Sequence, residues 1–490
     1  MLRLLRFDNQ CQIDGEDDND IFKQLDEHLS YKILGAEYSK AYKGYTNNRG
    51  EEVSWDGIKH IMTSSGRFPP GLFERVIDFY RSKGIFPQVI DRREPKTSSV
   101  EFDISKRLIE LGKTPRPYQI EATEKASAVE RGIIRLATGA GKTLIAAMIT
   151  AKLNKSTIIY VIGTDLLYQL QKLFADIFQQ EIGIIGDGHC EIKDINIATI
   201  WSIGKVLGVS KTTIDDDEEK EKAIDPDKFR QIKHLLLNTK THIMDECHLA
   251  ACDTVQDIAR NINAEYVYGM SASPWRDDGA DMLIEAFLGK KVVDYSARKL
   301  IKMGYLVNPD IRFLAPTPFP RKKAPYQTVY SKYIIENEQR NALIVKAATK
   351  LVEQGFPTMV LFNAIKHGDI LHNMLKKNIP VAILSGKDST KIRDKVKDDI
   401  ESGKTNCVLA SKIFDIGVDL PTMSGLVVSG GGKSSVRALQ RIGRVIRLSP
   451  GKTKAAVFDF ADQAPYLKNH AQARKNIYEA EFDVSWPKRI

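Results

Sequence analysis

The chain has 490 residues, which is room for about three domains of ~150 residues, and 42% of them are hydrophobic, so full cores can form. No apolar run approaches the ~18 residues of a membrane span, and residues 1–6 are too short an apolar stretch for a signal peptide. The net charge of +9 favours a polyanionic partner, and five scattered cysteines indicate reduced thiols in a cytoplasmic protein.

The first 97 residues contain no catalytic motif. An amphipathic helix is predicted up to about Lys83, and Asp78 with Glu94-Pro95-Lys96 loosely mimics a nuclease site in surroundings that are typical of a linker. The apolar side chains are sufficient for a small core of their own. We therefore predict an α+β domain whose core is Trp55, Ile58, Phe68, Leu72, Phe73, Ile77, Phe79 and Tyr80.

Between residues 115 and 296, short apolar segments alternate with helical patterns, which predicts a parallel sheet wrapped by helices. Strands are expected near 133–136, 157–162, 196–199, 241–245 and 266–270. The first strand leads through a glycine-containing loop into a helix over 143–153, a pattern that wraps backbone N–H groups around phosphate. The residues of this loop are Thr138, Gly139, Ala140, Gly141, Lys142 and Thr143.

A pair of carboxylates, Asp245 and Glu246, follows the predicted strand 241–245. The pair should lie near the phosphate loop, because ligands bind at the carboxyl ends of parallel strands. We predict that Lys142 binds the phosphates of a nucleoside triphosphate and that Thr143 and Asp245 ligate Mg²⁺. Glu246 would orient and deprotonate the attacking water.

A second alternation of strands and helices runs from about residue 311 to 459 and has no phosphate loop. Strands are expected near 358–362, 381–384, 407–410, 425–428 and 455–459. Two RecA-like domains with one nucleotide between them are the consequent prediction. Near the end, Arg441, Arg444 and Arg447 are spaced by three on one face of a predicted helix, and guanidinium groups suit the charge that develops on a transferred phosphate.

Six motifs stand in one order: RPYQ at 116–119, TGAGKT at 138–143, DECH at 245–248, SAS at 271–273, GVDLP at 417–421 and QRIGRVIR at 440–447. This order, over about 330 residues, resembles the superfamily 2 helicases and translocases. The segment from Ser273 to Gly279 resembles the Arg-acidic-Asp signature of XPB-type motors. The turn Trp55-Asp56-Gly57 and the helix start at Phe68 resemble the leading domain of the UvsW-like bacteriophage recombination helicases.

The resemblance implies further roles. Gln119 would recognise adenine with Arg116 beside it, Gly417 and Asp419 would contact nucleotide or nucleic acid, and Gln440 would position the hydrolytic water. His248, Ser271 and Ser273 would couple hydrolysis to domain motion, and Arg444 and Arg447 would be the phosphate-facing arginines. The nucleic-acid path would include Thr164, Thr199, Trp201, Phe362 and Ser411. For Trp201, stacking on a base and packing in the core stay open as alternatives.

We therefore expect an ATP- and Mg²⁺-dependent DNA helicase or translocase that acts on single-stranded, forked or junction DNA in recombination, repair or replication-fork processing. An RNA helicase of the DEAD type, an XPB-like or restriction-type double-strand translocase and an ATP-gated clamp are the alternatives. The expected domains are 1–97, 98–297 and 298–470 with a tail at 471–490. The protein is expected to be a monomer, in host cytoplasm if viral, with recombination or replication proteins as partners.

Residues 1–97 are expected to select the substrate, because a domain with its own core and no catalytic motif adds recognition to a motor. Lys40, Lys43, Lys59 and Arg67 would contact duplex phosphates beside a junction.

Overall fold

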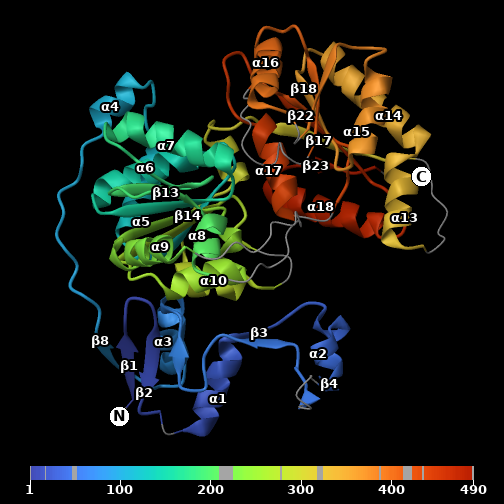
Figure 1. The fold of residues 1–490 in the computed structure, drawn as a ribbon. Helices are drawn as coiled ribbons and strands as arrows, with labels where there is room; N and C mark the ends of the chain where they lie inside the picture. The colour runs from blue at the N-terminus through green and yellow to red at the C-terminus, as the bar shows by residue number, and fades with distance from the viewer. Residues whose placement is uncertain are drawn as a thin grey trace. The chain divides into compact units, whose positions relative to one another are not determined.

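The computed structural model of the chain describes residues 2–16, 18–46, 52–208, 225–275, 279–316, 324–385, 388–411, 422–432 and 435–487. Contacts within the chain define two units, and each unit contains one large sheet (Figure 1). The first unit comprises Met1–Arg135 and Gly141–Asp294, and the second comprises Leu136–Ala140 and Tyr295–Ile490. Among the described residues, no helix has the length and apolar character needed to cross a membrane.

The first unit opens with a four-stranded sheet in the order β7-β2-β1-β8. Its strands are β1 (Arg3–Arg6), β2 (Cys11–Asp14), β7 (Arg67–Phe68) and β8 (Gln88–Asp91). Helices α1 (Asn19–His28) and α3 (Phe73–Ser82) pack with this sheet around a small apolar core. Six of the side chains that were predicted for this core lie in it: Phe68, Leu72, Phe73, Ile77, Phe79 and Tyr80.

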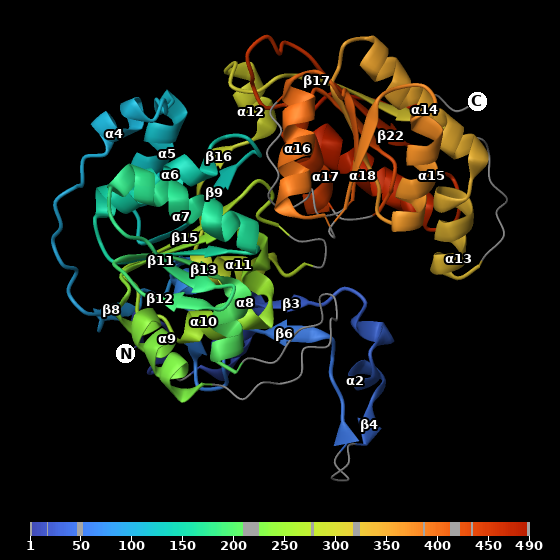
Figure 2. The same cartoon turned by 45° about the horizontal axis from the view of Figure 1, so that its top comes forward.

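Residues 30–46 and 52–60 form an arm that stands away from the four-stranded sheet (Figures 1 and 2). Its elements are β3 (Ser30–Lys32), η1 (Ala36–Tyr38), α2 (Lys40–Lys43), β4 (Tyr45–Thr46), β5 (Glu52–Val53) and β6 (Ile58–His60). Trp55 belongs to this arm, where its ring N–H donates to the carbonyl of Ile58 at 2.7 Å. Gly57 has φ +81°, and a Cβ at this position would lie 2.9 Å from that of Ala36, so the turn requires glycine.

The N-terminal sheet and its helices pack tightly on the rest of the first unit. Ala286 completes their core, and a Cβ at Gly71 would lie 2.1 Å from the carbonyl oxygen of Glu285. Arg75 pairs with the Glu285 carboxylate at 2.5 Å. Glu130 forms ion pairs with three cations of this region, Arg6 and Arg93 at 2.6 Å and Lys96 at 2.8 Å. The core of the N-terminal sheet therefore extends onto helix α11 (Asp281–Leu288) of the same unit.

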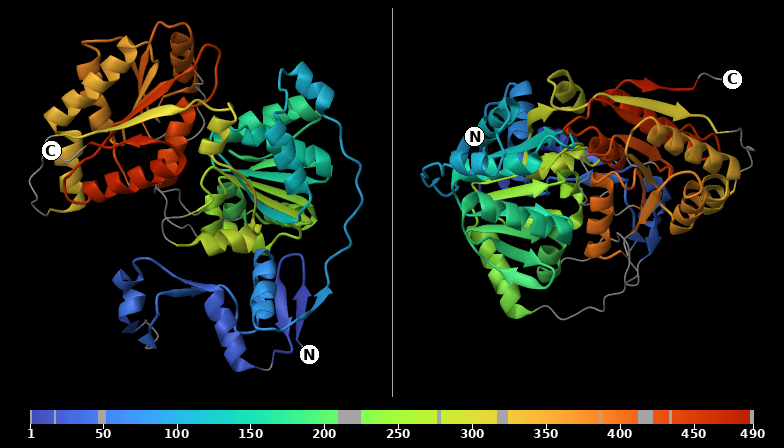
Figure 3. Two further views of the ribbon diagram at one scale, coloured as in Figure 1. Left: turned by 180° about the vertical axis from the view of Figure 1, so that it is seen from behind. Right: turned by 90° about the horizontal axis from the view of Figure 1, so that it is seen from above.

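The two carboxylates that loosely mimic a nuclease site form ion pairs with different lysines. Asp78 pairs with Lys290 at 2.9 Å, and Glu94 pairs with Lys240 at 3.2 Å. The segment after β8 is a connector that runs along the outside of the first unit to α4 (Ser105–Glu110), as the rear view in Figure 3 shows.

The large sheet of the first unit has the order β12-β11-β13-β10-β14-β15-β9-β16. The five predicted strands are confirmed, and β11, β12 and β16 extend the sheet on its two sides. The strands are β9 (Arg131–Leu136), β10 (Thr157–Val161), β11 (Gly183–Gly186), β12 (His189–Glu191), β13 (Ile195–Thr199), β14 (Thr241–Asp245), β15 (Tyr266–Ser271) and β16 (Lys291–Tyr295). The pairs from β11 through β9 in this order are parallel.

Helices cover both faces of this sheet, with α6 and α7 on one side and α8 and α10 on the other (Figure 1). Their bounds, with those of the remaining helices, are α5 (Pro117–Ser127), α6 (Lys142–Leu153), α7 (Thr164–Phe178), α8 (Ile200–Val206), α9 (Pro226–Asn238), η3 (Cys247–Ala251), α10 (Asp253–Arg260) and α11 (Asp281–Leu288).

The sheet of the second unit has the order β19-β20-β18-β21-β22-β17-β23, and every pair is parallel. The five predicted strands are confirmed as β18 to β22. The strands are β17 (Pro309–Leu314), β18 (Thr358–Leu361), β19 (Val381–Leu384), β20 (Cys407–Ala410), β21 (Gly425–Val428), β22 (Ala455–Phe460) and β23 (Val484–Ser485). The helices are α12 (Ala297–Lys302), α13 (Tyr326–Tyr330), the π-helical η4 (Ser331–Ile335), α14 (Glu338–Glu353), α15 (Ile365–Leu375), α16 (Thr390–Glu401), α17 (Ser435–Val445) and α18 (Leu467–Glu481).

The tail that was expected from residue 471 is instead part of the second unit. Helix α18 runs through residue 470, and β23 pairs with β17. The buried Arg474 of α18 pairs with Asp459 of β22 at 2.8 Å. Although its sequence is polar, this helix is therefore held against the sheet by a buried ion pair.

Candidate functional site

Three neighbouring strands of the first unit bring the predicted catalytic segments to one edge of the sheet. Their order is β14-β15-β9, and they run in parallel, so their carboxyl ends lie side by side. The phosphate loop follows β9, the acidic pair ends β14, and Ser271 ends β15. Chain segments separated by more than a hundred residues therefore meet at the place where α/β sheets bind ligands.

The phosphate loop has the backbone that its sequence predicts. Gly139 has φ +88° and Gly141 has φ +81°, and side-chain-bearing residues rarely adopt such values. Helix α6 begins at Lys142, so the positive end of the helix lies next to the loop. The loop and the helix start together offer N–H donors and positive charge to an anion.

Glu246 lies at the centre of a network of polar side chains. Its carboxylate lies 3.5 Å from Lys142 Nζ and 3.4 Å from His248 Nδ1, and it accepts a hydrogen bond from the Ser271 hydroxyl at 3.3 Å. The Ser271 hydroxyl accepts one from the Ser273 N–H at 3.1 Å. The structure thus joins the lysine of the phosphate loop, the predicted water-activating carboxylate and the three predicted coupling residues.

The two carboxylates differ in their electrostatics. Burial raises the pKa of Asp245 above its ordinary value. Burial acts in the same direction on Glu246, but Lys142 and His248 outweigh it and hold the pKa of Glu246 below its ordinary value. Glu246 is therefore ionised at neutral pH, which is the state that a proton acceptor requires.

Gln119 lies against the phosphate loop. It is buried, and a Cβ added at Gly141 would lie 2.4 Å from its Nε2, so the amide occupies the space that this glycine leaves. The Arg116 N–H donates to Gln119 Oε1 at 2.8 Å and so fixes the orientation of the amide. A side-chain amide carries both N–H donors and an oxygen acceptor, the two kinds of group that a base edge pairs with.

The arginines of the second unit are divided between a helix and an extended segment. Arg444 lies in α17, as predicted, but the helix ends at Val445, and the prediction that Arg447 continues the same helical face is wrong. Arg447 pairs with Leu306 in an antiparallel bridge, and the nearby Pro450 disfavours helix at the residue before it. Gln440 lies in α17 and is partly exposed.

Comparisons with known proteins agree with this geometry. The family described as type III restriction enzyme, res subunit, matches residues 112–276, and the family described as helicase conserved C-terminal domain matches residues 339–449. The ATP-dependent DNA helicase uvsW of Enterobacteria phage T4 is 27% identical over 97% of this chain and 93% of its own length. The DNA 3'-5' translocase XPB2 of Sulfurisphaera tokodaii is 25% identical over 73% of this chain and 83% of its own length.

The chain is an ATP-dependent helicase that resembles the UvsW-like superfamily 2 helicases over nearly its whole length. A solved fragment of a putative HsdR subunit of a type I restriction enzyme from Vibrio vulnificus YJ016 shares its fold. That structure matches with a TM-score of 0.56 and 21% identity over 76% of this chain and 68% of the fragment. The two large sheets of this helicase are accordingly its two RecA-like regions.

Two of the predicted nucleic-acid residues in the first unit are exposed and one is not. Thr164 is exposed at the start of α7, and Trp201, on α8, is 37% exposed, which favours surface contact over core packing. Thr199 is buried, and its hydroxyl caps α8 by accepting from the Ser202 N–H at 3.3 Å. The role of Thr199 in this structure is to position the helix that carries Trp201.

In the second unit, Phe362 does not offer a nucleic-acid contact through its side chain. The ring is 2% exposed and packs beneath Gly368, and its N–H donates to the Ala410 carbonyl at 3.0 Å. The polar group at this strand end is the adjacent Asn363. Ser411 follows β20 and is partly exposed, as a surface contact requires.

Other predicted positions lie outside the described residues. These are Gly417 and Asp419, together with the Arg276-Asp277-Asp278 segment of the XPB-like signature.

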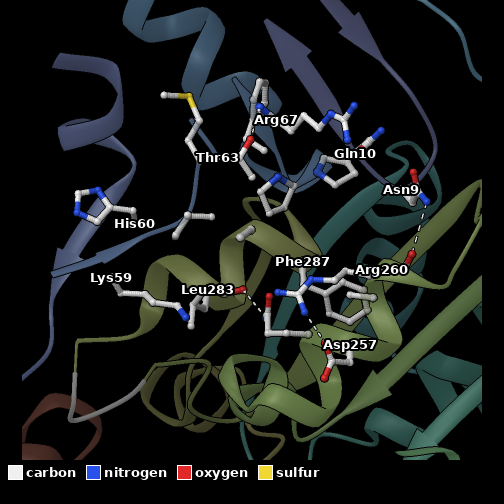
Figure 4. Close-up of a pocket in the computed structure, with 18 of the residues that line it drawn as sticks. Asn9, Gln10, Lys59, His60, Thr63, Arg67, Asp257, Arg260, Leu283 and Phe287 are labelled. Carbon is white, nitrogen blue, oxygen red and sulfur yellow. Dashed lines mark hydrogen bonds and ion pairs between the residues drawn. The ribbon is translucent and has the colours of Figure 1, made fainter. Parts of the chain in front are cut away.

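A cleft of about 690 Å³ lies between the N-terminal region and the RecA-like region of the first unit (Figure 4). Lys59 and Arg67 line it from one side and Arg260 and Asp257 from the other. Asn9 donates from Nδ2 to the Arg260 carbonyl at 3.5 Å across one end. Sequence reasoning named Lys59 and Arg67 but missed Arg260, because no local signal links residues almost two hundred positions apart.

Proposed function

We propose that this chain is an ATP- and Mg²⁺-dependent DNA helicase or translocase that unwinds or branch-migrates forked and junction DNA. The observation that carries the proposal is the network of Lys142, Glu246 and Ser271 at the carboxyl edge of a parallel sheet. A motor needs its phosphate sensor and its coupling segment in contact, so that hydrolysis changes the conformation. The DNA-directed names of the relatives, uvsW and XPB2, support DNA over RNA.

The donor set fits a nucleotide and its cation. Lys142 and the N–H groups at the start of α6 would hold the phosphates, and Gln119 with Arg116 would hold the base. The Thr143 hydroxyl and the Asp245 carboxylate are hard oxygen ligands of the kind that Mg²⁺ prefers, and a cation beside Asp245 would favour its ionised form. When bound, Mg²⁺ supplies neutralisation of phosphate charge. Glu246 would accept a proton from the attacking water.

The second RecA-like region supplies the arginines in this proposal. Arg444 and Arg447 would contact the terminal phosphate, and Gln440 would help to position the water. Because these contacts disappear when the phosphate leaves, hydrolysis would release one region from the other and move the strand that each holds. Thr164, Trp201 and Ser411 would grip that strand without reading its sequence.

Residues 1–97 would select branched DNA through the cleft that Lys59, Arg67 and Arg260 line. Because this region shares a core with the rest of the first unit through Ala286, deleting it would expose apolar surface, so point variants give the cleaner test. Lys59→Ser with Arg67→Ser should weaken binding to a four-way junction and reduce the steepness of its salt dependence. Lys23→Ser, an exposed lysine outside the cleft, is the matched control.

The decisive experiment measures ATP turnover of the full chain with single-stranded DNA, duplex, forked DNA, a four-way junction and RNA. Stimulation by forked or junction DNA above that by RNA is the expected result. A chain that RNA stimulates most would be an RNA helicase, and a chain that binds junctions without turnover would be a clamp. Either result contradicts the proposal.

A further inference from the structure

The second unit carries an aromatic cluster that the proposed nucleotide site does not use. The ring of Tyr326 on α13 has centroid distances of 5.8 Å to Tyr330, 6.0 Å to Tyr466 and 5.7 Å to His470. The cluster joins α13 to the start of α18, and Figure 1 shows these two elements side by side. Tyr326 remains 37% exposed and Tyr466 47% exposed. Aromatic surface is therefore presented to solvent at this point.

Tyr466 has a strained backbone. Its φ is +64° and its ψ is −45°, and the Leu467 N–H donates to the Pro465 carbonyl at 2.8 Å. These features define a γ-turn of the rare, strained kind. The strain persists because Ala464 and Leu467, on either side, are buried in a small apolar cluster with Val329. Glycine would adopt this turn without strain, so a half-exposed tyrosine at this position indicates a role for the side chain itself.

The cluster is connected by hydrogen bonds to the strand ends of the same unit. The Tyr330 hydroxyl donates to the Gly430 carbonyl at 2.7 Å, and Asn363 Nδ2 donates to the same carbonyl at 2.9 Å. Asn363 follows β18 and Gly430 follows β21, and these strands are neighbours. Arg441 of α17 donates to Asn363 Oδ1 at 3.4 Å. Tyr330, whose ring lies 5.8 Å from that of Tyr326, therefore connects the exposed rings to the strand end at which the second unit would meet nucleic acid.

We propose that Tyr326 and Tyr466 form a stacking site for an unpaired nucleobase of the strand that the second unit holds. The proposal rests on the proposed nucleic-acid motor function. Every base has a π-face, so stacking on tyrosine tolerates any sequence, which suits a protein that moves along a strand. Lys332, on the η4 helix that follows α13, and Lys468, on α18, are exposed, and they add positive charge for a phosphate backbone.

The test replaces Tyr466 in the full chain and measures binding of fluorescein-labelled oligothymidylate. Tyr466→Gly should weaken binding by about 5- to 100-fold, the range that one base–aromatic stack spans. The slope of affinity against salt should stay unchanged, because no phosphate contact is lost. The melting temperature should stay the same or rise, because glycine relieves the strained turn. Tyr466→Phe should bind like the wild type.

Turnover gives a second readout. In Tyr466→Gly, ATP turnover without nucleic acid should be unchanged, and the oligothymidylate concentration for half-maximal stimulation should rise while the maximal rate is kept. Ile392→Ala removes comparable exposed apolar surface from α16 and should change neither property.

Wild-type affinity in Tyr466→Gly would overturn the stacking site while leaving the motor function intact. Equal loss in Tyr466→Phe would assign the effect to the hydroxyl and would likewise overturn stacking. A wild-type chain whose turnover responds to no nucleic acid would overturn the proposed function itself, and the stacking site with it.

Discussion

The two RecA-like regions differ in how their buried charged side chains are paired. In the first, Lys142, Asp245 and Glu246 meet at strand ends, and the pKa values of the two carboxylates are shifted in opposite directions. In the second, two fully buried arginines are matched to carboxylates: Arg340 to Asp462 at 2.8 Å and Arg474 to Asp459 at 2.8 Å. The first arrangement places charged side chains where a substrate can reach them. In the second, each arginine is neutralised by a carboxylate of the protein.

The matched arginines of the second region also hold the chain that leads to α17. Arg340 donates to the Ser429 carbonyl at 2.8 Å, and Arg474 donates to the Gly432 carbonyl at 2.7 Å. Both carbonyls belong to the loop between β21 and the arginine helix. The comparison indicates that the first region carries the reactive groups, whereas buried charge in the second anchors the backbone that follows β21.

The largest effect is expected from Arg444→Ala. An arginine supplied to a transferred phosphate contributes about 10³–10⁵ in rate, so nucleic-acid-stimulated ATP turnover and unwinding should be lost to that extent. Binding of a fluorescent ATP analogue should persist, because the phosphate loop is intact. Arg312→Ala, an exposed arginine of the same region, is the control. Normal unwinding by Arg444→Ala would remove this arginine from the catalytic site.

Glu246→Gln is expected to reduce turnover by about 10²–10⁴, because the group that accepts the proton of water is lost. The isosteric amide keeps the contact with Ser271, so nucleotide binding should stay near wild type. Lys142→Ala should instead weaken nucleotide binding itself, which separates the two roles. Turnover near the wild-type level in Glu246→Gln would contradict the assignment.

Arg474→Met should destabilise the second region by about 3–5 kcal/mol, because Asp459 would be left buried without its cation. Urea unfolding monitored by fluorescence measures the change. The Arg312–Asp310 pair is exposed, so Arg312→Met should change the free energy of unfolding only slightly. If Arg474→Met had the same free energy of unfolding as Arg312→Met, the buried pair would not be what stabilises the second region.

The two regions share one acid-sensitive feature. His242 in β14 and His367 in α15 are buried, and burial lowers the pKa of each from 6.5 to about 3. The unfolded chain takes up these protons near pH 6.5 and the folded chain does not, so stability is full above that pH and falls as pH decreases toward 3. Each histidine should lower the free energy of unfolding by about 2 kcal/mol when the pH falls from 7 to 5.

His367→Gln tests this feature by urea unfolding at the two pH values. It should reduce the acid sensitivity of the second region by about 2 kcal/mol, because glutamine does not titrate. His234→Gln removes an exposed histidine and is the control for the substitution itself. Equal acid sensitivity in His367→Gln and the wild type would show that this histidine is not the titrating group.

Local sequence determined much of this protein. Period and composition predicted the ten central strands, and the glycines of the phosphate loop predicted its backbone, since φ values of +88° and +81° demand glycine. Strand ends carrying Asp245 and Ser271 were predicted to converge because parallel strands place their carboxyl ends on one edge.

Only the tertiary structure decided the rest. Sequence could not show that Arg474 is buried, because a polar helix near the end of a chain is normally exposed to solvent. Its burial depends on the partner Asp459, which only the structure places beside it. It could not show that Phe362 is covered or that Arg447 leaves the helix to pair with Leu306. The strain at Tyr466 depends on the simultaneous burial of Ala464 and Leu467 against another helix. These outcomes depend on contacts between distant segments, and such contacts leave no periodic trace in the chain.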